Sequence, residues 1–71
     1  MVPRQRLINK LREMGYRFKR DAWRVQFWIK GTHRPAIPKR DLLDDETVTQ
    51  ILRQCGATPD EIIAFIREAH N

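Results

Sequence analysis

The sequence lacks the features on which secreted mini-proteins and membrane proteins depend. Its 71 residues include one cysteine, Cys55, so no disulfide can form within the chain and a disulfide-stapled scaffold is excluded. The longest apolar runs cover only a few residues, which is too short for a signal peptide or a membrane-spanning helix. We therefore expect a protein of a reducing compartment, the cytoplasm, without a membrane partner.

Acidic residues are scarce in the first part of the chain and basic residues are scarce in the rest. Residues 1–40 contain twelve lysines and arginines against two acidic residues, a net charge of +10. Residues 41–71 contain two basic residues against seven acidic ones, a net charge of −5. Charge segregated in this way indicates a surface for a polyanion at one end of the molecule. The alternative is a basic face that is only solvated.

The apolar pattern predicts one domain, residues 1–71, that begins with a helix followed by three strands. Apolar residues at helical spacing between Pro3 and Gly15 predict a helix over 3–14. The period then changes to two, which predicts strands over 16–19, 24–30 and 34–38 with turns at 21–22 and 30–33. Pro35 and Pro38 lack N–H donors, so the third strand is expected at a sheet edge.

Two further helices are predicted in the acidic part. Asp44 is a suitable N-cap for a helix whose apolar stripe ends before Gly56. Thr58-Pro59-Asp60-Glu61 has the pattern of a capping box and predicts the start of the last helix. The fold class is therefore α+β, a two-layer αβββα sandwich with a three-stranded antiparallel sheet and an extra C-terminal helix.

Alternation in the second strand predicts which side chains face solvent. Val25, Phe27 and Ile29 are expected to face the helices, while Trp28 lies between Arg24 and Lys30 on the opposite face. A ring between cations is typical of a platform on which a nucleic-acid base stacks. The alternatives are a protein interface and burial of Trp28 beneath the last helix. Trp23 has the parity of the core residues and is assigned to core or strand-end packing.

The chain as a whole resembles the HicA toxins, small ribonucleases with a double-stranded-RNA-binding-domain-like (dsRBD-like) fold. The similarity begins in REMGYRFKR and is clearest in IPKRDLLDDETVTQILRQCGATPDEIIAFI, and it covers roughly residues 4–66. The resemblance implies an mRNA interferase of a toxin–antitoxin module. The family carries Gly-Ser-His at the start of its second strand, where Ala22-Trp23-Arg24 stands in this chain, and a second family histidine falls on Arg40.

Arginine does not supply the chemistry of the missing histidine. Cleavage of RNA by its own 2′-hydroxyl needs a proton acceptor near neutral pH, whereas arginine stays protonated and binds phosphate. His33, in the local sequence Gly31-Thr32-His33, is the candidate substitute for a catalytic group, but it lies at the other end of the predicted hairpin. Cys55, His33 and His70 do not have metal-ligand spacing, so neither a metal site nor a cofactor is predicted.

The leading hypothesis is a HicA-like protein that binds single- or double-stranded RNA, in which Arg24 replaces the family's catalytic histidine and cleavage at a family-like rate is not expected. The predicted RNA-binding residues share positive charge or an exposed ring: Arg17, Lys19, Arg24, Trp28, Lys30, Arg34, Lys39 and Arg40. One alternative is an active mRNA-cleaving toxin that uses His33, and another is a module that docks an antitoxin protein or a second copy of the chain. DNA binding by the last two helices is disfavoured because that part is acidic.

Overall fold

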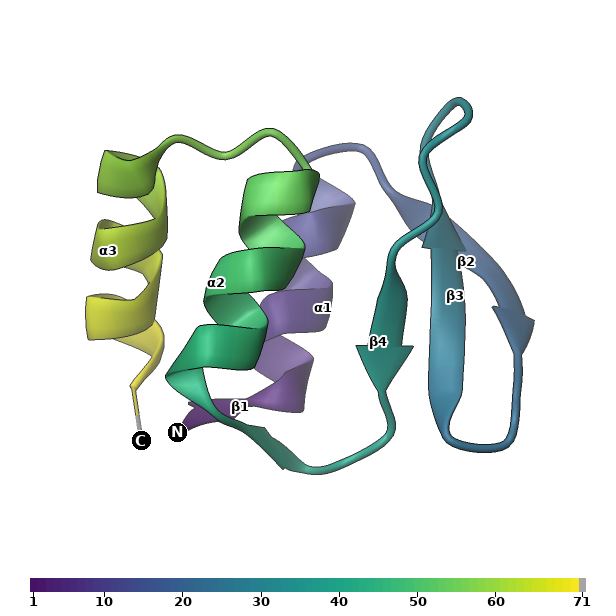
Figure 1. Ribbon diagram of the computed structural model, residues 1–71, viewed down its shortest axis with the longest axis horizontal. Coiled ribbons are helices and arrows are strands. Elements are labelled where there is room, and N and C mark those ends of the chain that lie inside the picture. Colours follow the sequence, from purple (N-terminus) through teal and green to yellow (C-terminus); the bar gives the residue numbers. More distant parts are fainter. Residues whose placement is uncertain (71) are drawn as a thin grey trace.

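Three helices and a three-stranded antiparallel sheet form the α+β fold of the computed structural model, which describes residues 1–70 (Figure 1). The helices are α1 (Arg4–Glu13), α2 (Asp45–Gln54) and α3 (Pro59–Ala69). The sheet has the order β2-β3-β4, with β2 at Arg17–Asp21, β3 at Val25–Ile29 and β4 at Ala36–Pro38. Across residues 1–70, every helix is too short or too polar to cross a membrane.

The helices lie on one side of the sheet. In Figure 1, α1 and α2 stand between the sheet and α3, so α3 is remote from the sheet. All three helices contribute to one buried cluster, with Leu7 and Leu11 from α1, Leu52 from α2 and Ile62 from α3, and Ile37 of β4 completes it from the sheet. One face of the sheet is thus packed against helices, and the other face is left without a layer.

The helix predictions are confirmed to within a residue or two. The expected stripe of α1 is buried at Leu7, Ile8 and Leu11. At the start of α3 the capping box is complete, because the Glu61 backbone N–H donates to Thr58 Oγ1 at 3.2 Å and the Thr58 N–H donates to Glu61 Oε1 at 2.8 Å. These reciprocal bonds satisfy two N–H groups that a helix start otherwise leaves unpaired.

A second, two-stranded sheet was not predicted. β1 (Val2–Pro3) pairs antiparallel with β5 (Leu42–Leu43), and Val2 and Leu43 are fully buried. Pro3 therefore stands just before α1 rather than as its first residue. The pairing holds the start of the chain against the segment that leads into α2, and it was missed because two-residue strands have no detectable period.

The predicted orientation of β3 is wrong. Trp28 lies on the helix-facing side, where Ile37 of β4 is also buried, while Val25, Phe27 and Ile29 lie on the uncovered side and are half-buried. β3 has apolar residues on both faces, so alternation alone does not choose between them. The indole is buried because it packs into the core cluster beneath Arg12 of α1, a contact with a distant part of the chain.

Candidate nucleic-acid interface

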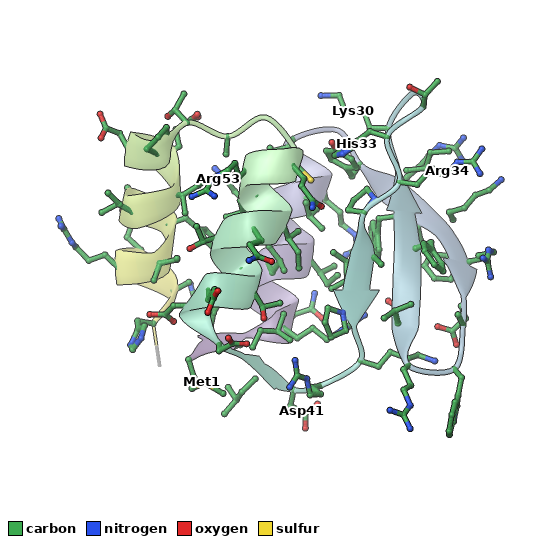
Figure 2. All side chains as sticks on the ribbon, in the orientation of Figure 1. Met1, Lys30, His33, Arg34, Asp41 and Arg53 are labelled. Carbon is green, nitrogen blue, oxygen red and sulfur yellow. The ribbon has the colours of Figure 1, made fainter. Side chains whose placement is uncertain are left out.

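The uncovered face of the sheet carries an apolar stripe bordered by arginines; we call it the outer face. Antiparallel pairing places Arg17 beside Ile29 and Arg20 beside Phe27. The β3–β4 register, continued toward the hairpin end, places Arg34 on the other side of Ile29. Residues directly opposite one another in a sheet project to the same face, so the cations flank the stripe. Figure 2 shows Arg34 pointing away from the helices.

One arginine of the outer face, Arg20, contacts the apolar stripe directly. The Arg20 guanidinium carbon lies 4.5 Å from the centroid of the Phe27 ring, a cation–π distance. Arg17, Arg20 and Arg34 are all exposed, so their guanidinium groups are accessible to a ligand. Lys19, in the bulge where the β2–β3 register shifts, is exposed as well. The outer face is therefore a cationic surface with an apolar stripe along its centre.

Trp28 does not belong to this surface, which corrects its assignment as a stacking platform. Its side chain is 3% exposed and belongs to the core cluster. Arg12 of α1 lies over the indole, with its guanidinium carbon 5.3 Å from the ring centroid, and the Phe18 ring contacts it edge-on with centroids 5.9 Å apart. A ring enclosed in this way cannot stack on a base, so Trp28 is a structural residue.

Lys30 is also separated from the outer face. Its Nζ donates a hydrogen bond to the Met14 carbonyl oxygen at 2.5 Å, and its stem packs beside Gly15, where φ is +98°. A cation at this position satisfies a carbonyl at the end of α1 and complements the negative end of the helix dipole. Gln26, predicted to face solvent, instead accepts a hydrogen bond from Arg4. The strand face predicted to bind RNA is therefore the face that holds α1.

Trp23 is the exposed tryptophan, and the sequence-based assignment of it to packing is wrong. It stands with Arg24 at the tip of the β2–β3 hairpin, where the Ala22 N–H donates to the Val25 carbonyl at 3.0 Å. Its side chain is 83% exposed. The ring borders a surface hollow whose other lining residues are Arg24, Val25, Pro38, Lys39 and Arg40. Three of these five residues are cationic.

Lys39 fixes the hairpin tip. Its Nζ donates to Asp21 Oδ2 at 2.9 Å and to the Ala22 carbonyl at 2.8 Å, and its backbone N–H donates to the Arg24 carbonyl at 3.0 Å. The hydrogen bond from Lys39 lowers the pKa of the Asp21 carboxyl, with a second contribution from Gln26. Lys39 is therefore paired, while Arg24 and Arg40 beside it are exposed.

His33 lies at the opposite end of β3 from Trp23 and is oriented by Tyr16. The β3–β4 hairpin closes with paired backbone bonds between Lys30 and His33, 3.0 Å each way, and Figure 2 shows His33 on the side of the helices. The Tyr16 hydroxyl and His33 Nδ1 are 2.5 Å apart. Burial, together with a hydrogen bond to Cys55, raises the pKa of Tyr16 to about 12, and burial raises the pKa of the Cys55 thiol. The contact with Tyr16 places His33 far from the cations of the hairpin tip.

Tyr16 is expected to ionise well above the pH at which free tyrosine does. It is the only tyrosine of the chain, so phenolate absorbance reports it alone. Because folding raises the pKa of Tyr16, burial of the neutral phenol stabilises the folded state fully below about pH 10. This contribution to the free energy of unfolding is lost as the pH rises through about 12. An alkaline titration should give a midpoint near 12 in buffer and near 10 in denaturing urea. A midpoint near 10 in both solvents would show that Tyr16 is not buried.

The acidic residues at the starts of α2 and α3 lie away from the sheet (Figure 1), whereas Asp21 lies at the hairpin tip, paired with Lys39. Asp45 and Glu46 occupy the first turn of α2, and Asp60 and Glu61 the first turn of α3. Within residues 1–70, acidic, cysteine and histidine side chains do not gather into a group that could hold a metal ion.

No family model, curated protein or solved structure matches the chain, so its functional assignment rests on the geometry and charge described above.

Proposed function

We propose that the protein binds RNA through the outer face and the adjoining hairpin tip. The observation that carries this proposal is the uncovered sheet face, on which Arg17, Arg20 and Arg34 border the Phe27–Ile29 stripe. Guanidinium groups bind phosphate in a bidentate manner, and the ring between them offers a surface for sugars and bases.

The charge distribution favours one orientation of the ligand. The basic strands and the acidic helix starts lie on different sides of the molecule, so a polyanion is drawn to the sheet and repelled from α2 and α3. This argues against nucleic-acid binding by the helices. The resemblance to HicA toxins, which remains part of the proposal, favours RNA over DNA as the ligand.

We propose binding without turnover. The hairpin tip carries Arg24, which remains protonated and can hold a phosphate but cannot accept a proton from a 2′-hydroxyl. His33, the remaining candidate base, lies at the other end of β3, beside Tyr16 rather than beside the cationic hollow. An active toxin that uses His33 would have to place the scissile phosphate at that end.

A protein partner is the second candidate, favoured by the half-buried Val25, Phe27 and Ile29. An antitoxin or a second copy docked on the outer face would bury this stripe, as interfaces bury apolar residues at their centres. In that case gel filtration of the chain, alone or with the partner, shows a complex that persists at high salt.

RNA binding is expected to weaken steeply with salt. For about five phosphate contacts on a single strand, affinity should fall about 100-fold between roughly 50 and 200 mM salt, because each contact releases condensed counterions. A gel-shift titration at several salt concentrations measures the slope, and the same gels show whether the RNA stays intact. Absence of binding at low salt, or binding that is insensitive to salt, would contradict the proposal. Cleavage that disappears in His33→Ala would identify His33 as the catalytic base.

A further inference from the structure

We propose that the Trp23 hollow is a subsite for one unpaired nucleobase, stacked on the indole, with the neighbouring phosphates held by Arg24 and Arg40. This inference rests on the proposed RNA function and adds to it a preference for single strands. Two features found together indicate this kind of ligand: an exposed aromatic ring, and cations that border the same hollow.

Neither folding nor local conformation explains a tryptophan at this position. Hairpin tips favour glycine, asparagine, aspartate and serine, because these residues suit turn geometry. Trp23 takes no left-handed backbone conformation and is excluded from the core cluster. An indole that is 83% exposed leaves a large apolar surface in water, which binding of a flat ligand would remove.

The geometry of the indole leaves one face for a ligand. The Arg24 guanidinium carbon lies 4.6 Å from the ring centroid, so one face of Trp23 is held by a cation–π contact. A cation–π contact of this kind favours one orientation of the ring, which would lower the entropy that binding must remove. A base on the opposite face would complete a guanidinium–indole–base stack, an arrangement in which each layer is planar.

The backbone beneath Trp23 is fixed by Lys39. Its two side-chain hydrogen bonds, to Asp21 and Ala22, and its backbone bond to Arg24 tie the tip to the segment directly after β4. An ammonium group has three donors, so Lys39 keeps one for the ligand. A duplex hides the faces of its bases within the helical stack, and only an unpaired base can reach the indole.

The test compares ligands that differ only in their bases. The probes are a single-stranded oligoadenylate, an RNA duplex of the same length, and a strand of the same length and charge whose bases are replaced by tetrahydrofuran spacers. Trp23→Leu should weaken oligoadenylate binding about 5- to 150-fold, the range that corresponds to loss of one stacked base. Its affinity for the duplex and for the spacer strand should stay at the wild-type value.

Two further variants act as controls. Trp23→Phe keeps an aromatic face and should retain most of the affinity for oligoadenylate. Ile63→Ala removes another exposed apolar side chain, 56% exposed on α3, and should change nothing. Oligoadenylate should also quench the tryptophan fluorescence of the wild type, and this quenching should be absent in Trp23→Leu, whose remaining tryptophan, Trp28, is buried.

The outcomes separate the subsite from the proposed function. If Trp23→Leu binds all three probes as the wild type does, the subsite is wrong while RNA binding by the outer face stands. If Trp23→Leu weakens the spacer strand as much as oligoadenylate, the indole does not stack on a base. If the wild type binds no probe at low salt, both proposals fail. A wild-type dimer that Trp23→Leu converts to a monomer would assign Trp23 to a protein interface instead.

Discussion

Trp28→Ala should come close to unfolding the protein, whereas Trp23→Ala should leave its stability almost unchanged. Truncation of a buried tryptophan costs about 3–5 kcal/mol through lost burial and the cavity that remains. A domain of 71 residues has about 4–10 kcal/mol of stability in total. Folding buries little of the Trp23 side chain. Trp23→Ala should therefore change the free energy of unfolding by less than about 0.5 kcal/mol.

Urea denaturation followed by circular dichroism measures both effects. Trp28→Phe serves as the graded control: it fills part of the cavity, so its midpoint should fall between those of the wild type and Trp28→Ala. The opposite order, with Trp23→Ala the less stable variant, would restore the sequence-based orientation of β3 and remove the structural basis of the outer face.

Reversing the two outer-face charges of β2 should largely abolish RNA binding. The double variant Arg17→Glu/Arg20→Glu replaces two phosphate contacts with repulsion on the face that we propose for RNA. At about 100 mM salt each contact contributes roughly a factor of five, so the expected loss is on the order of 10- to 100-fold or more. The slope of affinity against salt should also become shallower by about 0.7 for each contact removed.

The matched control carries the same charge on another side of the molecule. Arg6→Glu/Arg67→Glu also lowers the net charge from +5 to +1, but at α1 and α3. If binding depended only on net charge, the two double variants would lose affinity equally. We expect the control to retain most of the affinity, and gel shifts of both variants at the same salt concentration decide the matter.

The parts of the fold that depend on local sequence could be predicted. Helical stripes of apolar residues locate α1 and α2, and the capping box locates the start of α3, because each signal is contained within one or two turns. The class, α+β with a three-stranded antiparallel sheet, follows from the order of these segments.

The face of β3 could not be derived from alternation, since Val25, Phe27 and Ile29 compete with Trp28. The outcome depends on contacts with residues far along the chain: Arg12 over the indole, and Ile37 buried on the same side. A shift of one residue in a strand exchanges both faces, so this single error moved Lys30 to the solvent side and Trp28 to the candidate site.

The sequence therefore predicted the cationic residues of the candidate site but not its exposed aromatic residue, Trp23. The predicted Arg17 and Arg34 flank the stripe, and Arg24, Lys39 and Arg40 border the hollow, as the basic pattern of the first forty residues suggested. Trp23 was missed because it was given the parity of a strand residue. The sequence did contain an indication of its exposure. A turn that includes Asp21-Ala22 places the next residue, Trp23, at the hairpin tip rather than in a paired strand.

β2 lies at the edge of the sheet, and this position gives its charges a second consequence. All five of its residues are exposed, four of them are charged, and the bulge at Lys19 interrupts its regular spacing. An edge strand with open backbone groups is a template for pairing with another chain, and charge and irregularity are the usual means of preventing it. The cations that we propose for RNA binding therefore also protect this edge of the sheet, so we expect their replacement with neutral apolar residues to promote aggregation.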